Sequence, residues 1–209
     1  MIIHWLGLSS FKIKSGEITI VIDPLARSSY GTKQPSGEID ICLLSSGFLN
    51  YDKKTLEDCS YVFKNPGEYE VKDVGIQINP SLGPDGMKNN IFSIKWQGLK
   101  IVHLGILKQK NSINQVLEKI NGTDVLMIPV GGKTVMGATD AVEIVHRIEP
   151  SIAVPMFYKD GKTKDVFGLD DAKYFIQEMG QEIEEIDKLK IDKASINRDK
   201  TRLMIIRPS

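Results

Sequence analysis

The first half of the chain alternates short apolar runs with turn residues. Nine runs are rich in β-branched and aromatic residues, and turn signals such as Ser15-Gly16, Asn65-Pro66-Gly67 and Pro84-Asp85-Gly86 separate them. This pattern predicts a sheet-rich region. The predicted strands are Ile2–Leu6, Phe11–Lys14, Ile18–Asp23, Asp40–Leu44, Tyr61–Lys64, Tyr69–Val71, Gly75–Ile78, Ile91–Trp96 and Lys100–Leu104.

The second half alternates helical and extended patterns. We expect a helix that Asp140 caps, with Glu143 three residues on, and a helix that stops at Gly180. The predicted elements are helix Asn111–Ile120, strand Asp124–Val130, the helix after Asp140, strand Ser151–Met156, helix Asp170–Met179 and strand Arg202–Arg207. Strands followed by helix–strand units predict two packed sheets with helices on their outer faces. Because no linker or repeat divides the chain, we expect a single domain over residues 1–209.

Composition narrows the classes of partner. Hydrophobic residues make up 41% of the 209 residues, enough for a continuous core. Lys+Arg and Asp+Glu both total 27, so nothing favours nucleic acid or an anionic membrane as a partner. The N-terminus has no secretory signal pattern and no stretch is apolar enough to span a bilayer, so we expect a soluble, cytoplasmic protein. We interpret Cys42 and Cys59 as two buried, reduced thiols.

Six short motifs resemble the lactonase-like, Zn-dependent hydrolase branch of the metallo-β-lactamase superfamily. They occur in that family's order and run nearly end to end. They are Trp5-Leu6-Gly7-Leu8-Ser9-Ser10-Phe11, Ile22-Asp23-Pro24, Pro66-Gly67-Glu68-Tyr69-Glu70, His103-Leu104-Gly105-Ile106-Leu107, Ile128-Pro129-Val130-Gly131-Gly132 and Pro155-Met156-Phe157-Tyr158. The resemblance implies a four-layer αββα sandwich, the metallo-β-lactamase fold.

The departures from this family fall on the positions that hold its metals. In such enzymes histidines and carboxylates bind two metal ions, through the motif H-x-H-x-D-H and further ligands. The matching positions here carry side chains of another kind: Leu8, Ser46, Phe48, Asn50, Tyr51, Ile106 and Phe157. A further family histidine has no candidate between Gln77 and Asn89. We therefore expect degenerate ligand positions, a pocket filled by apolar side chains, and no metal or other cofactor.

Four polar residues are candidates for a residual pocket: Asp23, Asp52, His103 and Lys133. We expect Asp23 to accept backbone N–H groups of its loop, Asp52 to cap the next helix, His103 to be packed and hydrogen-bonded, and Lys133 to lie at the surface. His4 and His146 read as structural or surface residues. A single metal on Asp23, Asp52 and His103 has no motif behind it, and a nucleophile at Ser45 or Ser46 with His103 as base has no orienting acid.

Two functions of different classes follow from these patterns. The first is a catalytically inactive homologue with no metal centre and no catalytic residues, which binds an unidentified ligand or protein, pairs as a homo-oligomer, or docks through the strand Arg202–Arg207. The alternative is a hydrolase or lactonase that uses a reorganised site. The first predicts apolar packing at the ligand positions. The second predicts an open cleft where His103, Asp23 or Asp52 converge.

Overall fold

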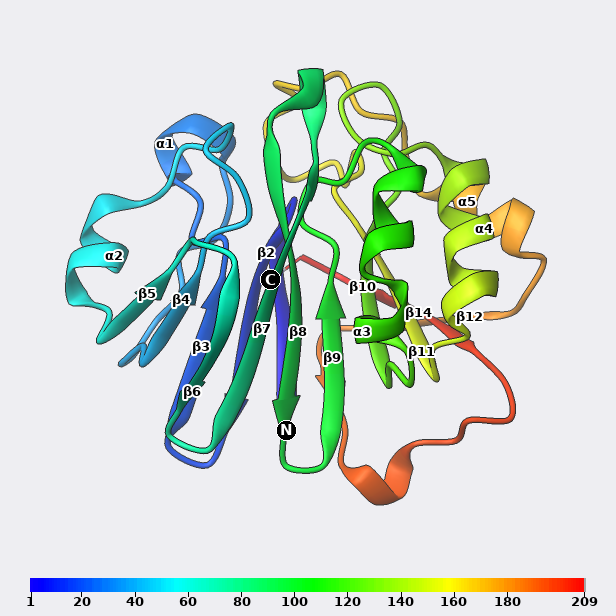
Figure 1. The fold of residues 1–209 in the computed structure, drawn as a ribbon. Helices are drawn as coiled ribbons and strands as arrows, with labels where there is room; N and C mark the ends of the chain where they lie inside the picture. The colour runs from blue at the N-terminus through cyan, green and yellow to red at the C-terminus, as the bar shows by residue number, and fades with distance from the viewer. Residues whose placement is uncertain (209) are drawn as a thin grey trace.

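Two β-sheets lie face to face at the centre of the structure, a computed structural model that describes residues 1–208 (Figure 1). The smaller sheet has the order β13-β1-β2-β3-β4-β5. Its strands are β1 (Ile2–Gly7), β2 (Ser10–Ser15), β3 (Ile18–Ile22), β4 (Ile41–Leu43), β5 (Tyr61–Phe63) and β13 (Leu189–Lys190).

The larger sheet has the order β12-β14-β11-β10-β9-β8-β7-β6. Strands β6, β7, β8 and β9 pair antiparallel with one another. Strands β9, β10, β11, β14 and β12 pair parallel. Its strands are β6 (Gly67–Val71), β7 (Val74–Leu82), β8 (Lys88–Trp96), β9 (Leu99–His103), β10 (Val125–Pro129), β11 (Ile152–Met156), β12 (Ile183–Ile186) and β14 (Arg202–Ile206).

Helices lie outside both sheets. Helices α3, α4 and α5 lie on the side of β10, β11 and β14, whereas α1 and α2 lie beside the smaller sheet (Figure 1). The α-helices are α1 (Arg27–Tyr30), α2 (Lys53–Asp58), α3 (Leu117–Ile120), α4 (Ala138–Ile148) and α5 (Lys173–Met179), and 3-10 turns span Pro84–Gly86, Lys110–Gln115 and Lys193–Ser195. This arrangement confirms the predicted αββα layers.

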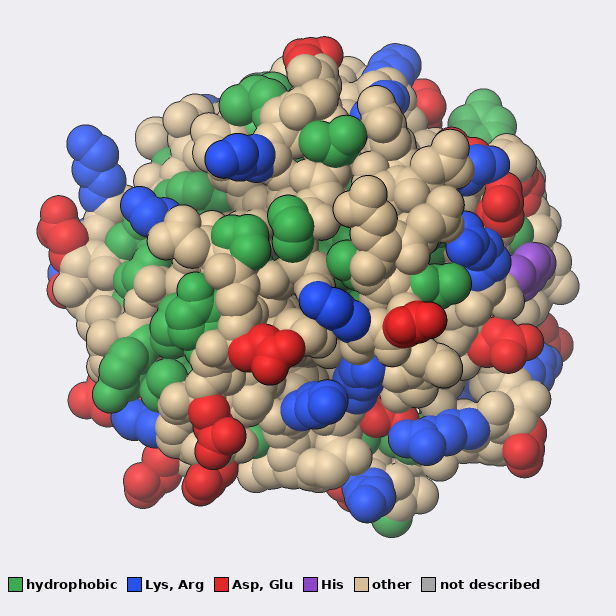
Figure 2. Space-filling model, viewed as in Figure 1, with side chains coloured by type: hydrophobic (Ala, Val, Ile, Leu, Met, Phe, Trp, Pro, Cys, Tyr) green, Lys and Arg blue, Asp and Glu red, His purple; other side chains and the backbone are tan. Residues whose placement is uncertain are grey.

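The core follows from side-chain alternation along the strands. In β2, Phe11 and Ile13 are fully buried between the sheets, while Lys12 and Lys14 point outward. Every residue of β10 is buried, because a central parallel strand is covered on both faces. Acidic and basic side chains are interspersed over the surface in Figure 2, as the balanced composition predicts. In residues 1–208, no helix is long and apolar enough to cross a membrane.

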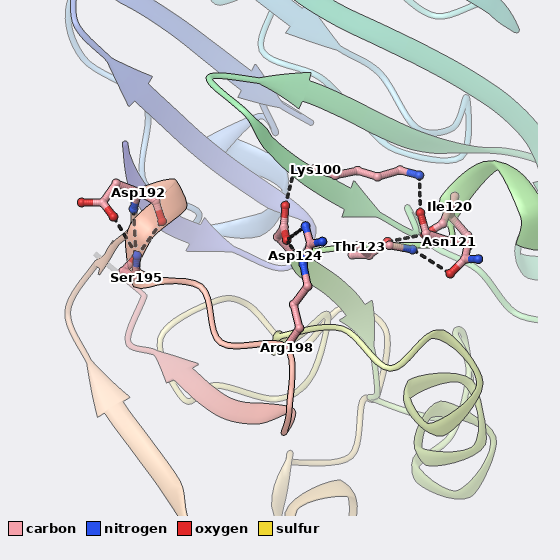
Figure 3. A network of polar contacts seen from close by, with 9 residues as sticks. Lys100, Ile120, Asn121, Thr123, Asp124, Asp192, Ser195 and Arg198 are labelled. Atoms are coloured by element: carbon pink, nitrogen blue, oxygen red, sulfur yellow. Dashed lines mark hydrogen bonds and ion pairs between the residues drawn. The ribbon is translucent and has the colours of Figure 1, made fainter.

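A buried carboxylate fastens the C-terminal part of the chain to the larger sheet. Asp124 is 1% exposed and accepts hydrogen bonds from the backbone N–H of Lys100 and from the guanidinium of Arg198, both at 2.8 Å (Figure 3). The Lys100 ammonium in turn donates to the carbonyls of Lys119 and Asn121. A buried charge is tolerated when it is paired and hydrogen-bonded in this way.

Three predicted helices differ from the observed ones. The region Asn111–Ile120 is a 3-10 turn followed by the short α3, and Asn and Ser, which it contains, have a lower helix propensity than Ala or Leu. Helix α4 begins after Gly137, so Asp140 does not cap it; Asp140 and Glu143 instead pair with the Lys110 ammonium at 2.9 and 2.6 Å. Helix α5 begins at Lys173 rather than at Asp170.

Two further predictions need correction. The strand Arg202–Arg207 is observed as β14, which lies between β12 and β11, so it is not a free edge for docking. Cys42 is buried as predicted, but Cys59 is only half-buried because it follows the end of α2 at the surface. Both thiols are free.

Candidate functional site

The ends of several strands from both sheets meet at one place. Strands β1, β3 and β4 run in the same direction, so the residues that follow them lie at one edge of the smaller sheet. Backbone hydrogen bonds join this edge to the larger sheet: Phe157 N–H donates to the Leu8 carbonyl at 3.1 Å, and Asn90 N–H donates to the Ser45 carbonyl at 2.7 Å. The sequence-predicted positions after these strands are therefore brought together.

Asp23 forms the centre of a buried polar cluster. The Asp23 carboxylate accepts the Ser45 N–H at 2.7 Å and the Ser45 hydroxyl at 2.6 Å. The Tyr51 hydroxyl lies 3.2 Å from the same carboxylate. Burial raises the pKa of Asp23 to about 6, against the hydrogen bonds from Ser45 that favour the ionised form. Asp23 accepts a backbone N–H as predicted, but the donor is Ser45 in the loop after β4 rather than a residue of Asp23's own loop.

Tyr51 closes the loop that follows β4. Its hydroxyl donates to the Ser46 carbonyl at 2.7 Å and accepts the Ser46 N–H at 3.0 Å. Burial and the neighbouring Asp23 charge raise the pKa of Tyr51 well above its ordinary value, so the phenol stays protonated. The Ser46 hydroxyl points elsewhere and donates to the Lys88 carbonyl at 2.7 Å.

Apolar side chains occupy the remaining positions that the family resemblance assigns to metal ligands. Leu8, Ile106 and Phe157 are 1%, 0% and 0% exposed, and Phe48 is half-buried. Phe157 and Phe48 both contact Phe167, with ring centroids 5.2 and 5.8 Å apart. Asn50 is exposed.

The donor set at these positions does not fit a dinuclear metal centre. Three side chains are aliphatic or aromatic and fully buried, and Ser46, Asn50 and Tyr51 provide only neutral oxygen or amide groups. Within residues 1–208, no three His, Cys, Asp or Glu side chains gather as metal ligands would. The assignment of the seven positions as former ligand positions rests on the resemblance and stays a prediction.

His103 is packed and hydrogen-bonded, as predicted. Its ring is fully buried against Phe11 and Phe92, and its Nδ1 accepts the Gly105 N–H at 3.0 Å. Its Nε2 therefore carries the proton and donates to the Ser9 carbonyl at 2.9 Å. Burial lowers the pKa of His103 to about 4, so the ring is neutral at physiological pH.

The four candidates for a residual pocket do not converge. Asp52 caps α2 by accepting the Thr55 N–H at 2.9 Å, as predicted, and His103 bonds to Ser9 rather than to Asp23 or to either candidate serine. Lys133 lies at the surface, with its ammonium 4.0 Å from Asp170. The cleft expected for a reorganised site with His103 as base is therefore not formed; the polar group that does form consists of Asp23, Ser45 and Tyr51.

Three residues that directly follow strands whose ends meet here have left-handed backbone conformations. Leu8, Asp23 and Phe157 directly follow β1, β3 and β11 and have φ angles of 52, 47 and 52°, in the left-handed region that non-glycine residues rarely adopt. Such conformations cost free energy, and they are frequent at functional sites. Periodicity and motif spacing contain no signal for this strain.

Two residues near the site, Asn89 and Phe167, were not predicted from the sequence. Asn89 donates to the Leu104 carbonyl at 3.0 Å and accepts the Ile106 N–H at 2.8 Å, so it fixes the turn after β9. Phe167 supplies the ring on which Phe48 and Phe157 pack. Asn89 lies two residues before the predicted strand Ile91–Trp96, and neither periodicity nor motif pointed to Asn89 or Phe167.

Comparison with known proteins places this architecture in a family. The model of the β-lactamase superfamily domain matches residues 2–157. A UPF0173 protein of Pyrococcus furiosus is 37% identical over 181 residues, with 76% of this chain and 83% of the relative covered. A UPF0173 metal-dependent hydrolase of Methanobrevibacter smithii is 23% identical over 198 residues, with 76% and 82% covered. The chain therefore belongs to the β-lactamase superfamily and, within it, to the UPF0173 proteins.

Solved structures agree with this placement. A candidate Zn-dependent hydrolase of the metallo-β-lactamase superfamily from Thermotoga maritima is 27% identical, with a TM-score of 0.80 and 98% of each chain covered. Igni18, a metallo hydrolase from Ignicoccus hospitalis, shares the fold at 15% identity, with a TM-score of 0.69 and 100% of this chain and 95% of that chain covered. The metallo-β-lactamase fold expected from the six motifs is confirmed.

The expectation of a catalytically inactive homologue is wrong. Relatives of this chain are named metal-dependent hydrolases, and a solved relative is described as a Zn-dependent hydrolase. These comparisons favour the alternative hydrolase interpretation, and they do not show the loss of a metal that the inactive interpretation assumed. The inference from replaced ligands to lost activity failed because it equated one ligand set with all hydrolytic chemistry.

Proposed function

We propose that this protein is a hydrolase of the metallo-β-lactamase fold that acts on an ester or lactone through Ser45 and Asp23. The observation that carries the proposal is the 2.6 Å hydrogen bond from the Ser45 hydroxyl to a buried Asp23 carboxylate whose pKa lies at about 6. The names of the relatives support the reaction class. Their metal dependence is not carried over, because the donor set at the matching positions does not fit.

Asp23 has the properties of a general base. With a pKa of about 6 it is ionised at neutral pH yet more basic than an ordinary carboxylate, which suits proton transfer near physiological pH. It already accepts the hydroxyl proton that would have to be removed. A nucleophile held against a base in this way is the usual arrangement for covalent hydrolysis.

The reaction would proceed in two stages. The Ser45 oxygen attacks the carbonyl carbon while its proton moves to Asp23, and that proton then passes to the leaving alkoxide. Water next attacks the carbonyl carbon of the acyl–Ser45 ester while its proton moves to Asp23. The bond between that carbon and the Ser45 oxygen then breaks, the acid is released, and the proton returns from Asp23 to the Ser45 oxygen. Tyr51, protonated and hydrogen-bonded between Asp23 and Ser46, holds the loop in register with the carboxylate.

Access to Ser45 requires the loop to move. Ser45 is 1% exposed, and the half-buried Phe48 and the exposed Gly47 follow it. A Cβ built on Gly47 would meet no atom within 4 Å, so the loop has free space at this residue.

The test is hydrolysis of a panel of aryl esters and lactones by wild-type protein, Ser45→Ala, Asp23→Asn and the matched control Ser46→Ala. We expect kcat to fall about 100-fold or more in the first two variants and to stay within a few-fold of wild type in the control, whose hydroxyl bonds to Lys88. Circular dichroism establishes that each variant is folded. Wild-type activity that survives unchanged in Ser45→Ala would refute the assignment.

A further inference from the structure

The two cysteines of the chain lie against each other on the smaller sheet. Cys42 belongs to β4 and is fully buried with Val21 and Ile39, and Cys59 packs against the same cluster from the end of α2. The two thiols are in hydrogen-bonding contact. Helix α2, β4 and β5 form the corresponding side of the molecule in Figure 1.

The pair differs in access to solvent and in acidity. Cys59 is half-buried, and its thiol also donates to the Tyr61 carbonyl at 3.3 Å, whereas Cys42 is 0% exposed. The hydrogen bond between the thiols lowers the pKa of Cys59 below its ordinary value, and the same bond together with burial raises the pKa of Cys42. Cys59 is therefore the sulfur that an external reagent meets first.

We propose that Cys42 and Cys59 are a thiol–disulfide modification site that a low-molecular-weight disulfide oxidises to an internal disulfide. The Cys59 thiolate attacks one sulfur of the reagent, forms a mixed disulfide and expels the first thiolate. The Cys42 thiol then loses its proton and attacks the Cys59 sulfur, which expels the second thiolate. Two protein thiols are oxidised, one reagent disulfide is reduced to two thiols, and no other reactant is required.

A disulfide between Cys42 and Cys59 would constrain the loop that contains Ser45. The segment between the two cysteines includes Ser45, Ser46, Tyr51 and the whole of α2. A Cys42–Cys59 bond would close this segment into a covalent loop and restrict the movement that Ser45 needs to meet a substrate. The disulfide itself does not depend on the proposed hydrolase activity, because thiol oxidation is measured without any substrate.

The test is incubation of the full chain with oxidised glutathione, followed by thiol counting under denaturing conditions and by peptide mapping. We expect free thiols to fall from two to zero, with the loss of two hydrogens and a single peptide cross-link between Cys42 and Cys59. A reducing agent should restore both thiols. Two free thiols after oxidation, or a product that stops as the glutathione adduct of Cys59, would overturn the proposal.

Two variants separate the steps. Cys42→Ala should accumulate one glutathione adduct at Cys59, whereas Cys59→Ala should keep one unmodified thiol, because Cys42 is shielded from solvent. If Cys42→Ala is unfolded, the order of attack is read instead from the adduct that precedes the disulfide in a wild-type time course. An adduct that forms first on Cys42 would contradict the proposed order.

Discussion

The Asp23 carboxylate accepts both the backbone N–H and the hydroxyl of Ser45, at 2.7 and 2.6 Å. The hydroxyl bond favours the ionised carboxylate, whereas burial favours the protonated one, and burial is the larger effect. The pair therefore joins the end of β3 to the loop after β4 and also sets the proton affinity of the base.

Removal of the Ser45 hydroxyl should raise the pKa of Asp23 above about 6, because a hydrogen bond to the ionised form is lost while burial is retained. The measurement is a carbon-13 NMR titration of the Asp23 carboxyl in Ser45→Ala. Ser46→Ala is the matched control, since the Ser46 hydroxyl donates to Lys88 instead. An unchanged pKa in Ser45→Ala would show that the hydroxyl does not act on the carboxylate.

Asp23 and His103, both fully buried, should have opposite effects on stability between pH 4 and pH 6. Asp23 has a folded-state pKa of about 6 against 3.8 unfolded, so the native state holds more protons and stability falls as pH rises through this window. His103 has a folded-state pKa of about 4 against 6.5 unfolded, so the unfolded state holds more protons and stability rises with pH. Each effect is on the order of 3 kcal/mol, and they largely cancel in wild-type protein.

Single substitutions should reveal each effect. In Asp23→Asn, the free energy of unfolding should rise as pH increases from 4 to 6.5, and in His103→Gln it should fall between pH 4 and pH 6. Urea denaturation at half-unit pH intervals measures both slopes. Parallel curves for the two variants would contradict the assigned burial of these groups.

Ile106 should behave as a core residue. Ile106→Asp places an unpaired carboxyl at a 0% exposed position and should destabilise the protein by about 3 kcal/mol or more, or prevent folding. The matched control Ile106→Val should cost roughly 1 kcal/mol. Thermal unfolding of both variants, with and without added Zn²⁺, provides the comparison. A stable Ile106→Asp protein would show that this position opens to a polar cavity.

Asp52 should contribute to stability through its cap. Asp52→Ala removes the acceptor for the Thr55 N–H and should lower the free energy of unfolding by about 1 kcal/mol. Asp58→Ala, at the exposed end of the same helix, should change it by less than about 0.5 kcal/mol, because Asp58 pairs with Lys54 where both side chains are exposed to solvent. Equal effects in chemical denaturation would argue against the cap.

Sequence reasoning predicted the layers of the fold better than the chemistry of the site. Alternating apolar residues in runs such as Phe11–Lys14 define one buried face, and the structure places these strands within a few residues of the predicted bounds. The cap at Asp52 and the stop at Gly180 are local signals and were predicted correctly. Asp140 was misread because its long-range partner, Lys110, is not adjacent in sequence.

The Asp23–Ser45 pair could not be predicted from spacing. The two residues are brought together by the parallel pairing of β3 with β4, and Asp23 has a left-handed φ of 47°, which spacing does not reveal. The family motifs made His103 a candidate site residue, but in the structure its ring is hydrogen-bonded to the Ser9 carbonyl and not to Asp23 or Ser45. The replaced ligand positions suggested an inactive protein, and the names of the relatives correct that interpretation.

The most direct test of the central claim is the pH dependence of ester or lactone hydrolysis by wild-type protein and Asp23→Asn. The proposal predicts that wild-type kcat/KM rises with pH through an apparent pKa of about 6 and that Asp23→Asn loses about 100-fold or more in rate. A wild-type rate that does not change between pH 5 and pH 7, or one that Asp23→Asn retains, would contradict the assignment of Asp23 as the base.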